Sequence, residues 1–234
     1  NISEIAKKLS LILTVGVSAE SGYLVSKYAT KASEFGAEQV MVAPPIMKKP
    51  NEKVLYRYYE EVNNAISKET KIVIQDLPEQ SGVHMSPEFM VNLDKKLGKV
   101  NSIKLEDPPT PSKITKIAKI KNQDLKIFGG LGGLFFLEEL MRGASGTMTG
   151  FAFTEILVEI YDLFSKNKTE EAKKIFYKWL PLIRYENTVG ISLSIRKEIL
   201  KQRKITKFSN VRYPTPIMDS DDKNELNLIL QDYL

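Results

Sequence analysis

Short apolar runs rich in β-branched residues recur along this chain, and each is followed by a segment with helical periodicity. The runs begin about 20 to 33 residues apart, which is the length of one strand, one helix and two loops. Six can be read, at residues 11–17, 39–43, 71–75, 100–104, 125–128 and 146–150. Strands that are apolar on both faces and joined by helices form parallel sheets. The sequence therefore predicts an α/β fold.

The segments between the runs are predicted to be amphipathic helices, at residues 21–35, 52–67, 87–96, 110–121 and 134–142. Ser86 followed by Pro87 is typical of a helix start, because serine caps the first turn and proline suits its first position. After Gly150 only helices are predicted, at residues 154–166, 169–185, 189–202 and 221–234. Six strands fit either an open, doubly wound sheet or part of a closed βα barrel, which has eight.

Composition excludes several classes of function. The chain has no cysteine, which excludes disulfides and suits a reducing, cytoplasmic compartment. Its single histidine, His84, excludes histidine-rich metal sites, and we expect neither a metal nor another cofactor. The net charge is only +5 and the basic residues are spread along the chain, so we expect no nucleic-acid partner. No apolar run reaches the ~18 residues of a membrane span, so we expect no membrane partner.

Two groups of residues leave alternatives open. The basic cluster at residues 196–207 is interpreted as a solvated helix face, with a polyanion site as the alternative. The glycines at 129–133 lie between a predicted strand and a helix, where they form either a tight turn or a cradle for an anion or substrate. They are not a dinucleotide fingerprint, because Phe135 stands where the third glycine should fall.

Lys104 is the residue most suggestive of chemistry. It closes the run at 100–104, at the C-terminal end of a predicted strand, where α/β proteins place their sites. A lysine whose ammonium is desolvated loses its proton more readily and can attack a carbonyl to form a Schiff base. The alternative is a structural ion pair with Glu106 or Asp107 nearby. His84, in a loop before a helix, is expected to be structural or exposed, with substrate contact as the alternative.

Taken in order, several segments resemble the dihydrodipicolinate synthase / N-acetylneuraminate lyase family. They are VMVAPPIMKKP at 40–50, KIVIQDLPEQSGVHMSPE at 71–88, NSIK at 101–104, GASGTMTG at 143–150 and RYPTPIMD at 212–219. The resemblance implies a (β/α)8 TIM barrel with a C-terminal helical extension, of which six strands, the third to the eighth, are present and the first two βα units are missing. Residues 1–153 would form the partial barrel and residues 154–234 its last helix and the extension, packed as one structural domain.

The same resemblance implies roles for single residues. Lys104 would be the lysine that forms a Schiff base with pyruvate or another 2-keto acid, and Gly130 and Met148 would contact that substrate. Gln75 stands where the family has a proton-relay tyrosine, and Met47 where many members have a second tyrosine.

Gln80 replaces an arginine that grips the second substrate in the lysine-pathway enzymes. These replacements argue against dihydrodipicolinate synthase activity itself. Another group must then serve as the proton relay, and Asp76, Glu106 and Thr149 are the polar candidates at strand ends.

Three hypotheses about function follow. The first is a cytoplasmic class I aldolase or lyase that acts on pyruvate or a related 2-keto acid, working as a homo-oligomer, either a tetramer or a dimer. The second is a non-catalytic barrel relative that binds a metabolite or serves as an assembly subunit. The third is an α/β protein that binds a phosphate ligand through the glycines at 129–133.

Overall fold

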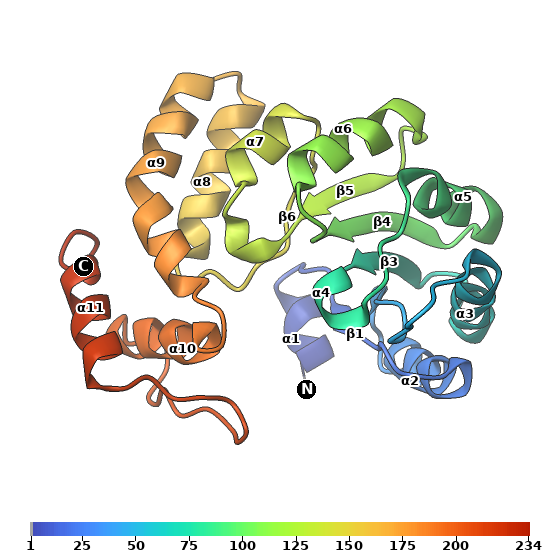
Figure 1. Ribbon diagram of the computed structural model, residues 1–234, viewed down its shortest axis with the longest axis horizontal. Coiled ribbons are helices and arrows are strands. Elements are labelled where there is room, and N and C mark those ends of the chain that lie inside the picture. The colour runs from blue at the N-terminus through green and yellow to red at the C-terminus, as the bar shows by residue number, and fades with distance from the viewer. Residues whose placement is uncertain (1) are drawn as a thin grey trace. The chain divides into compact units, whose positions relative to one another are not determined.

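The computed structural model describes residues 2–234 (Figure 1). The chain forms two compact units, which are described separately. The first consists of the residues up to Gly129 together with Arg142–Ser145. The second consists of Gly130–Met141 and Gly146–Leu234. The expected division into residues 1–153 and 154–234, packed as one structural domain, stays a prediction.

Six strands are present, in the places where the sequence predicts them. They are Thr14–Gly16 (β1), Gln39–Val42 (β2), Lys71–Asp76 (β3), Val100–Leu105 (β4), Lys126–Gly129 (β5) and Gly146–Thr147 (β6). In the first unit, β1 to β5 lie in the sheet in the order in which they occur in the sequence. Each of the neighbouring pairs from β1 to β5 is parallel. The prediction of an α/β fold with a parallel sheet is confirmed.

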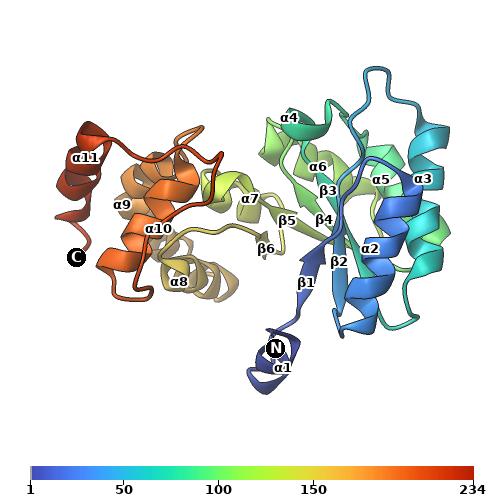
Figure 2. The same cartoon turned by 90° about the horizontal axis from the view of Figure 1, so that it is seen from below.

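Three helices of the first unit begin at residues whose side chains cap them. The unit contains Ile2–Lys8 (α1), Gly22–Glu34 (α2), Glu52–Ala65 (α3), Pro78–Ser81 (α4), Pro87–Leu97 (α5) and Thr110–Ile120 (α6). Ser21, Asn51 and Ser86 each accept a backbone N–H from the first turn of α2, α3 and α5, respectively. Figure 2 shows α2, α3 and α5 along one side of the strands.

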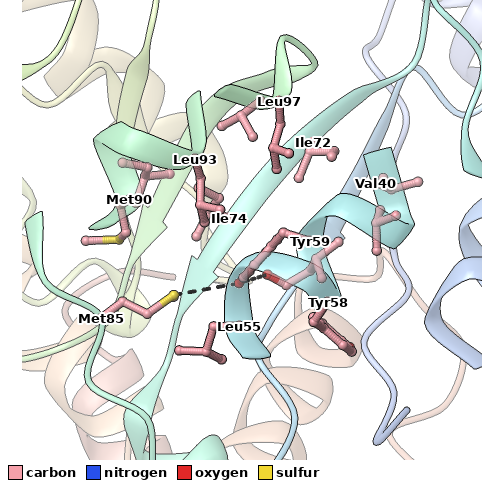
Figure 3. Close-up of a cluster of buried hydrophobic side chains, with 14 of the residues drawn as sticks. Val40, Leu55, Tyr58, Tyr59, Ile72, Ile74, Met85, Met90, Leu93 and Leu97 are labelled. Carbon is pink, nitrogen blue, oxygen red and sulfur yellow. Dashed lines mark hydrogen bonds between the residues drawn. The ribbon is translucent and has the colours of Figure 1, made fainter. Parts of the chain in front are cut away.

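The first unit has its hydrophobic core between the sheet and these helices. Ile72 and Ile74 of β3 are fully buried there. Figure 3 shows Ile74 close to Leu93 of α5 and Tyr59 of α3. The Tyr59 hydroxyl donates to the Val42 carbonyl at 3.1 Å, and burial raises its pKa well above 10.0, so this phenol is a structural group. Burial of these apolar side chains holds the strand ends in place.

The second unit is helical apart from β6. It contains a short 3-10 helix at Leu131–Gly133 (η1) and the helices Phe136–Met141 (α7), Thr154–Ser165 (α8), Thr169–Glu186 (α9), Ser192–Gln202 (α10) and Ser220–Leu230 (α11). Its separate core is built around the chain's single tryptophan, Trp179, which packs against Phe153 and Tyr233 with ring centroids 4.7 and 4.5 Å away. No helix within residues 2–234 combines the length and apolar character needed to cross a membrane.

Candidate active site

Two of the predicted site residues, Gln75 and Lys104, lie side by side at the ends of neighbouring strands. Gln75 on β3 is the register partner of Lys104 on β4, which is in turn the partner of Phe128 on β5. Successive residues in a strand point to opposite faces. Ile74 and Leu105, the sequence neighbours of Gln75 and Lys104, belong to the core beneath the helices. Gln75 and Lys104 therefore face the other side of the sheet.

A carboxylate joins these two side chains. The Lys104 Nζ lies 3.1 Å from Glu106 Oε1, and the Gln75 amide Nε2 donates to Glu106 Oε2 at 2.8 Å. Only 14% of the Lys104 side chain and 10% of the Glu106 side chain are exposed. The amine of Lys104 is thus shielded from most of the solvent and has a proton acceptor within hydrogen-bonding distance.

Side chains alternate between the two faces of the sheet, which places Lys104 and Glu106 on one face and the other nearby acids on the opposite face. Asp76 and Asp107 point to the helix side, where both accept from Lys113 Nζ, at 2.6 and 2.7 Å. Asp76 is thus paired with Lys113 on the helix side, which favours Glu106 over Asp76 as the relay, and both candidates stay predictions. Burial raises the pKa of Asp76 although Lys113 opposes this effect.

His84 joins the same group on the helix side. Its Nδ1 lies 3.0 Å from Asp107 Oδ1, and its side chain is 73% exposed. Burial acts to raise the pKa of Asp107, but hydrogen bonds from Lys113 and His84 outweigh it, so the pKa is lowered. These residues border a cavity of about 310 Å³, which Lys104 and Glu106 do not line. The structural interpretation of His84 fits this position.

The glycines at 129–133 have a conformational explanation. Gly132 and Gly133 have φ of +68° and +87°, which L side chains rarely adopt. A Cβ at Gly132 would lie 2.7 Å from Asn187, whose amide donates to the Leu131 carbonyl at 2.9 Å. The glycines thus permit a tight turn fastened to the end of α9, and this geometry favours the turn over an anion cradle.

Comparison with known proteins decides the family. Residues 2–233 match the model of the Dihydrodipicolinate synthetase family. The chain belongs to that family. It is 25% identical over 230 residues to an L-2-keto-3-deoxyarabonate dehydratase of Azospirillum brasilense, across 96% of this chain and 72% of that protein. It is 26% identical over 174 residues to a 4-hydroxy-tetrahydrodipicolinate synthase of Thermosipho melanesiensis, across 74% of this chain and 59% of that protein.

Solved structures of synthetase-family members agree with this assignment. The dihydrodipicolinate synthase of Rhodopseudomonas palustris superposes with a TM-score of 0.90 at 31% identity, covering 98% of this chain and 78% of that one. The synthase of Thermotoga maritima gives a TM-score of 0.88 at 20% identity, which shows the shared fold. A TIM-barrel-like architecture is thereby confirmed. The relatives named here are a dehydratase and synthases, and the expectation of an enzyme family of the lyase class is confirmed as well.

The other residues predicted from the family are distributed over both units. Met47 is half-buried against the first core, and its backbone N–H donates to the Ser81 carbonyl at 3.1 Å. Gln80 is exposed on α4. Gly130 and Met148 belong to the second unit, and their roles stay predictions.

Thr149 also lies in the second unit, next to the end of β6. Its hydroxyl is buried without a hydrogen-bond partner among residues 2–234, as is that of Thr147. In the same part of the chain, no three His, Asp or Glu side chains are grouped to hold a metal ion.

The structure adds one group that sequence reasoning did not single out, the Lys113 ammonium on α6. The sequence shows that α6 contains several lysines, but it does not show which of them is buried. Its partners Asp76 and Asp107 lie 37 and 6 residues away in the sequence, respectively. Only the folded sheet brings them to one place.

Proposed function

We propose that this family member is a lyase that forms a Schiff base between Lys104 and pyruvate or a related 2-keto acid. The observation that carries the proposal is the Lys104 amine, 3.1 Å from the Glu106 carboxylate and largely shielded from solvent. Attack on a carbonyl requires a neutral amine. Glu106 is close enough to accept the proton that the ammonium must lose.

The covalent adduct makes bond cleavage possible by stabilising a carbanion. After the amine has added to the keto carbon and water has left, the resulting iminium withdraws electrons from the neighbouring carbon. A carbanion that forms there is stabilised, so that a C–H or C–C bond can break near neutral pH. The same iminium is hydrolysed at the end of the cycle, which releases the product and restores Lys104.

Glu106 is proposed as the proton relay. The amide of Gln75, at the position of the family's tyrosine, does not release a proton as a phenol does. Its Nε2 instead holds Glu106 Oε2, while Oε1 is directed to Lys104. The relay function has thus moved from β3 to the residue that follows β4, and Gln75 orients it.

The proposed substrate is a 2-keto acid with a hydroxyl on the carbon β to the keto group. The dehydratase from Azospirillum, which matches 96% of this chain, supports this substrate class. The Glu106 carboxylate removes a proton from the carbon next to the iminium, which gives an enamine. Glu106 then returns that proton to the β-hydroxyl, which leaves as water, so that the carboxylate is regenerated. Glutamine at 75 and 80 and methionine at 47 argue against the lysine-pathway condensation. Gly130 and Met148 are proposed as contacts to the keto acid, on the family resemblance.

Borohydride trapping tests the Schiff base. Incubation with pyruvate and borohydride should reduce the iminium to a stable secondary amine, and peptide mapping should find the added mass on Lys104. Lys104→Ala should abolish both the adduct and turnover, because no other amine occupies that position. Lys116→Ala, an exposed lysine of α6, is the control and should behave like the wild type. A folded wild-type chain that gives no adduct would contradict the proposal.

A second candidate is a non-catalytic relative that binds a metabolite or serves as an assembly subunit. The replacement of the relay tyrosine by Gln75 favours it. It predicts that Lys104→Ala leaves keto-acid affinity and oligomeric state unchanged, which calorimetry and light scattering would measure. For the lyase, we propose a cytoplasmic homo-oligomer, a tetramer or a dimer, and the same light-scattering measurement tests that assembly.

A further inference from the structure

A buried cation lies behind the candidate active site. Lys113 on α6 is 13% exposed, and its Nζ contacts Asp76 Oδ2 at 2.6 Å and Asp107 Oδ2 at 2.7 Å. None of the Asp76 side chain and 11% of the Asp107 side chain is exposed. Lysine is seldom buried unless it is paired, and here one ammonium is shared by two carboxylates.

The two carboxylates that contact Lys113 are the sequence neighbours of Gln75 and Glu106, which form the candidate site with Lys104. Asp76 follows Gln75, and Asp107 follows Glu106. The Glu106 backbone N–H also donates to the Asp76 carbonyl at 2.9 Å. Lys113 thus joins the end of β3 to the segment after β4, from the face opposite to Lys104.

We propose that Lys113 is a positioning residue that holds the Glu106 carboxylate against the Lys104 amine. The inference rests on the proposed function, since it concerns the same proton transfer. If Lys113 releases Asp107, the segment 106–107 is left with the Glu106 N–H bond to the Asp76 carbonyl and the exposed His84 contact. The segment can then shift, and the Glu106 carboxylate loses its alignment with Gln75 and Lys104. A misplacement of about 1 Å at a reacting group can lower a rate by about 100-fold.

The test compares two lysines of the first unit. Lys113→Met removes the shared ammonium but keeps the aliphatic stem. Lys99→Met is the matched control, because Lys99 is also part-buried and donates to the carbonyls of Asn63 and Ile66, at 2.7 and 2.8 Å, away from Lys104. We expect Lys113→Met to lower kcat by roughly 10- to 100-fold with little change in KM. Lys99→Met should lower only the melting temperature.

Two further variants keep the proposal falsifiable if Lys113→Met does not fold. Lys113→Arg retains a cation and should restore most of kcat. The triple variant Asp76→Asn, Lys113→Met, Asp107→Asn removes the Asp76–Lys113–Asp107 cluster, called the clamp below, without leaving a buried unpaired charge. It should fold and show the same low kcat. A wild-type kcat in this folded triple variant would overturn the proposal.

A crystal structure of the triple variant separates failure of this inference from failure of the proposed function. With the clamp removed, we expect the Glu106 carboxylate to lie beyond ion-pair distance of Lys104 Nζ, whatever reaction the protein catalyses. An unchanged contact would overturn the positioning role. Failure of the wild type to trap pyruvate would instead overturn the proposed Schiff-base function and leave the structural result standing.

Discussion

Glu106 and Asp107 are adjacent in the sequence but contact different lysines. Glu106 contacts Lys104 on one face of the sheet, and Asp107 contacts Lys113 on the other. The physical reason is that the alternation of side chains along β4 continues into the two residues after its end, where the Glu106 N–H still bonds to the Asp76 carbonyl of β3. Of the acids near Lys104 in the sequence, Glu106 is therefore the one placed to exchange protons with it.

A substitution at Glu106 tests this role directly. Glu106→Gln keeps the size of the side chain and an oxygen for the Gln75 amide, but it cannot transfer a proton. We expect kcat for a hydroxylated 2-keto acid to fall by about 10²- to 10⁴-fold, the usual contribution of general acid–base catalysis. Steady-state kinetics would measure this, with Glu79→Gln, an exposed acid of α4, as the control. An unchanged kcat would show that the relay lies elsewhere.

At the scale of elements, α9 ends in a carboxylate that joins two other segments of the second unit. Glu186 is 2% exposed and accepts from the Ala152 N–H at 2.9 Å and from Arg196 Nε at 2.8 Å. Burial raises its pKa above 4.5, although both hydrogen bonds and the charge of Arg196 oppose the effect. The Glu186 carboxyl thus connects the end of α9 to two other segments, and its burial disfavours its ionised form.

This penalty predicts a pH dependence. The folded state binds the Glu186 proton more tightly than the unfolded chain does. The contribution of Glu186 to the free energy of unfolding is therefore present below pH 4.5 and is lost as the pH rises from 4.5 through the raised folded-state value. Glu186→Gln removes the titration, so this free energy should fall less steeply with pH.

Urea unfolding followed by Trp179 fluorescence would measure the effect, because the single tryptophan lies in the core of the second unit. Glu170→Gln, at an exposed position in the first turn of α9, is the control and should leave the slope unchanged. A slope in Glu186→Gln equal to that of the wild type would contradict the assignment of the titration to Glu186.

The hydrophobic periodicity of the sequence predicted most of the helices and strands, and the helices that it missed have a physical explanation. The helices predicted at 52–67 and 110–121 appear as Glu52–Ala65 and Thr110–Ile120. The seven residues of Ile2–Lys8 and the four of Pro78–Ser81 were not predicted. Helices this short gain little from local hydrogen bonding and depend on tertiary contacts, so they leave no clear periodic pattern.

At the scale of the whole molecule, family membership limits the chemistry but does not name the substrate. The named relatives include a dehydratase and synthases, and their chains are similar to this one at 25% and 26% identity. The contacts that select a substrate lie on βα loops, which vary independently of the strands that carry Lys104.

The substrate class is therefore a prediction for the whole protein. We expect the protein to convert a 2-keto-3-deoxy sugar acid into a product lighter by one water, and to leave pyruvate with aspartate semialdehyde unchanged. Mass spectrometry of the two reaction mixtures would distinguish the activities, with Lys104→Ala as the blank. Condensation of pyruvate with the semialdehyde would contradict the interpretation of Gln75 and Gln80.

The sequence by itself determined the α/β alternation, the six strand positions and the place of Lys104 at a strand end. These features are local, because hydrophobic periodicity and capping act over a few neighbouring residues. Only the tertiary structure decided which acids meet which lysines. Gln75 reaches Glu106 across 31 residues and Lys113 reaches Asp76 across 37, and such contacts depend on strand register and on which face a side chain occupies.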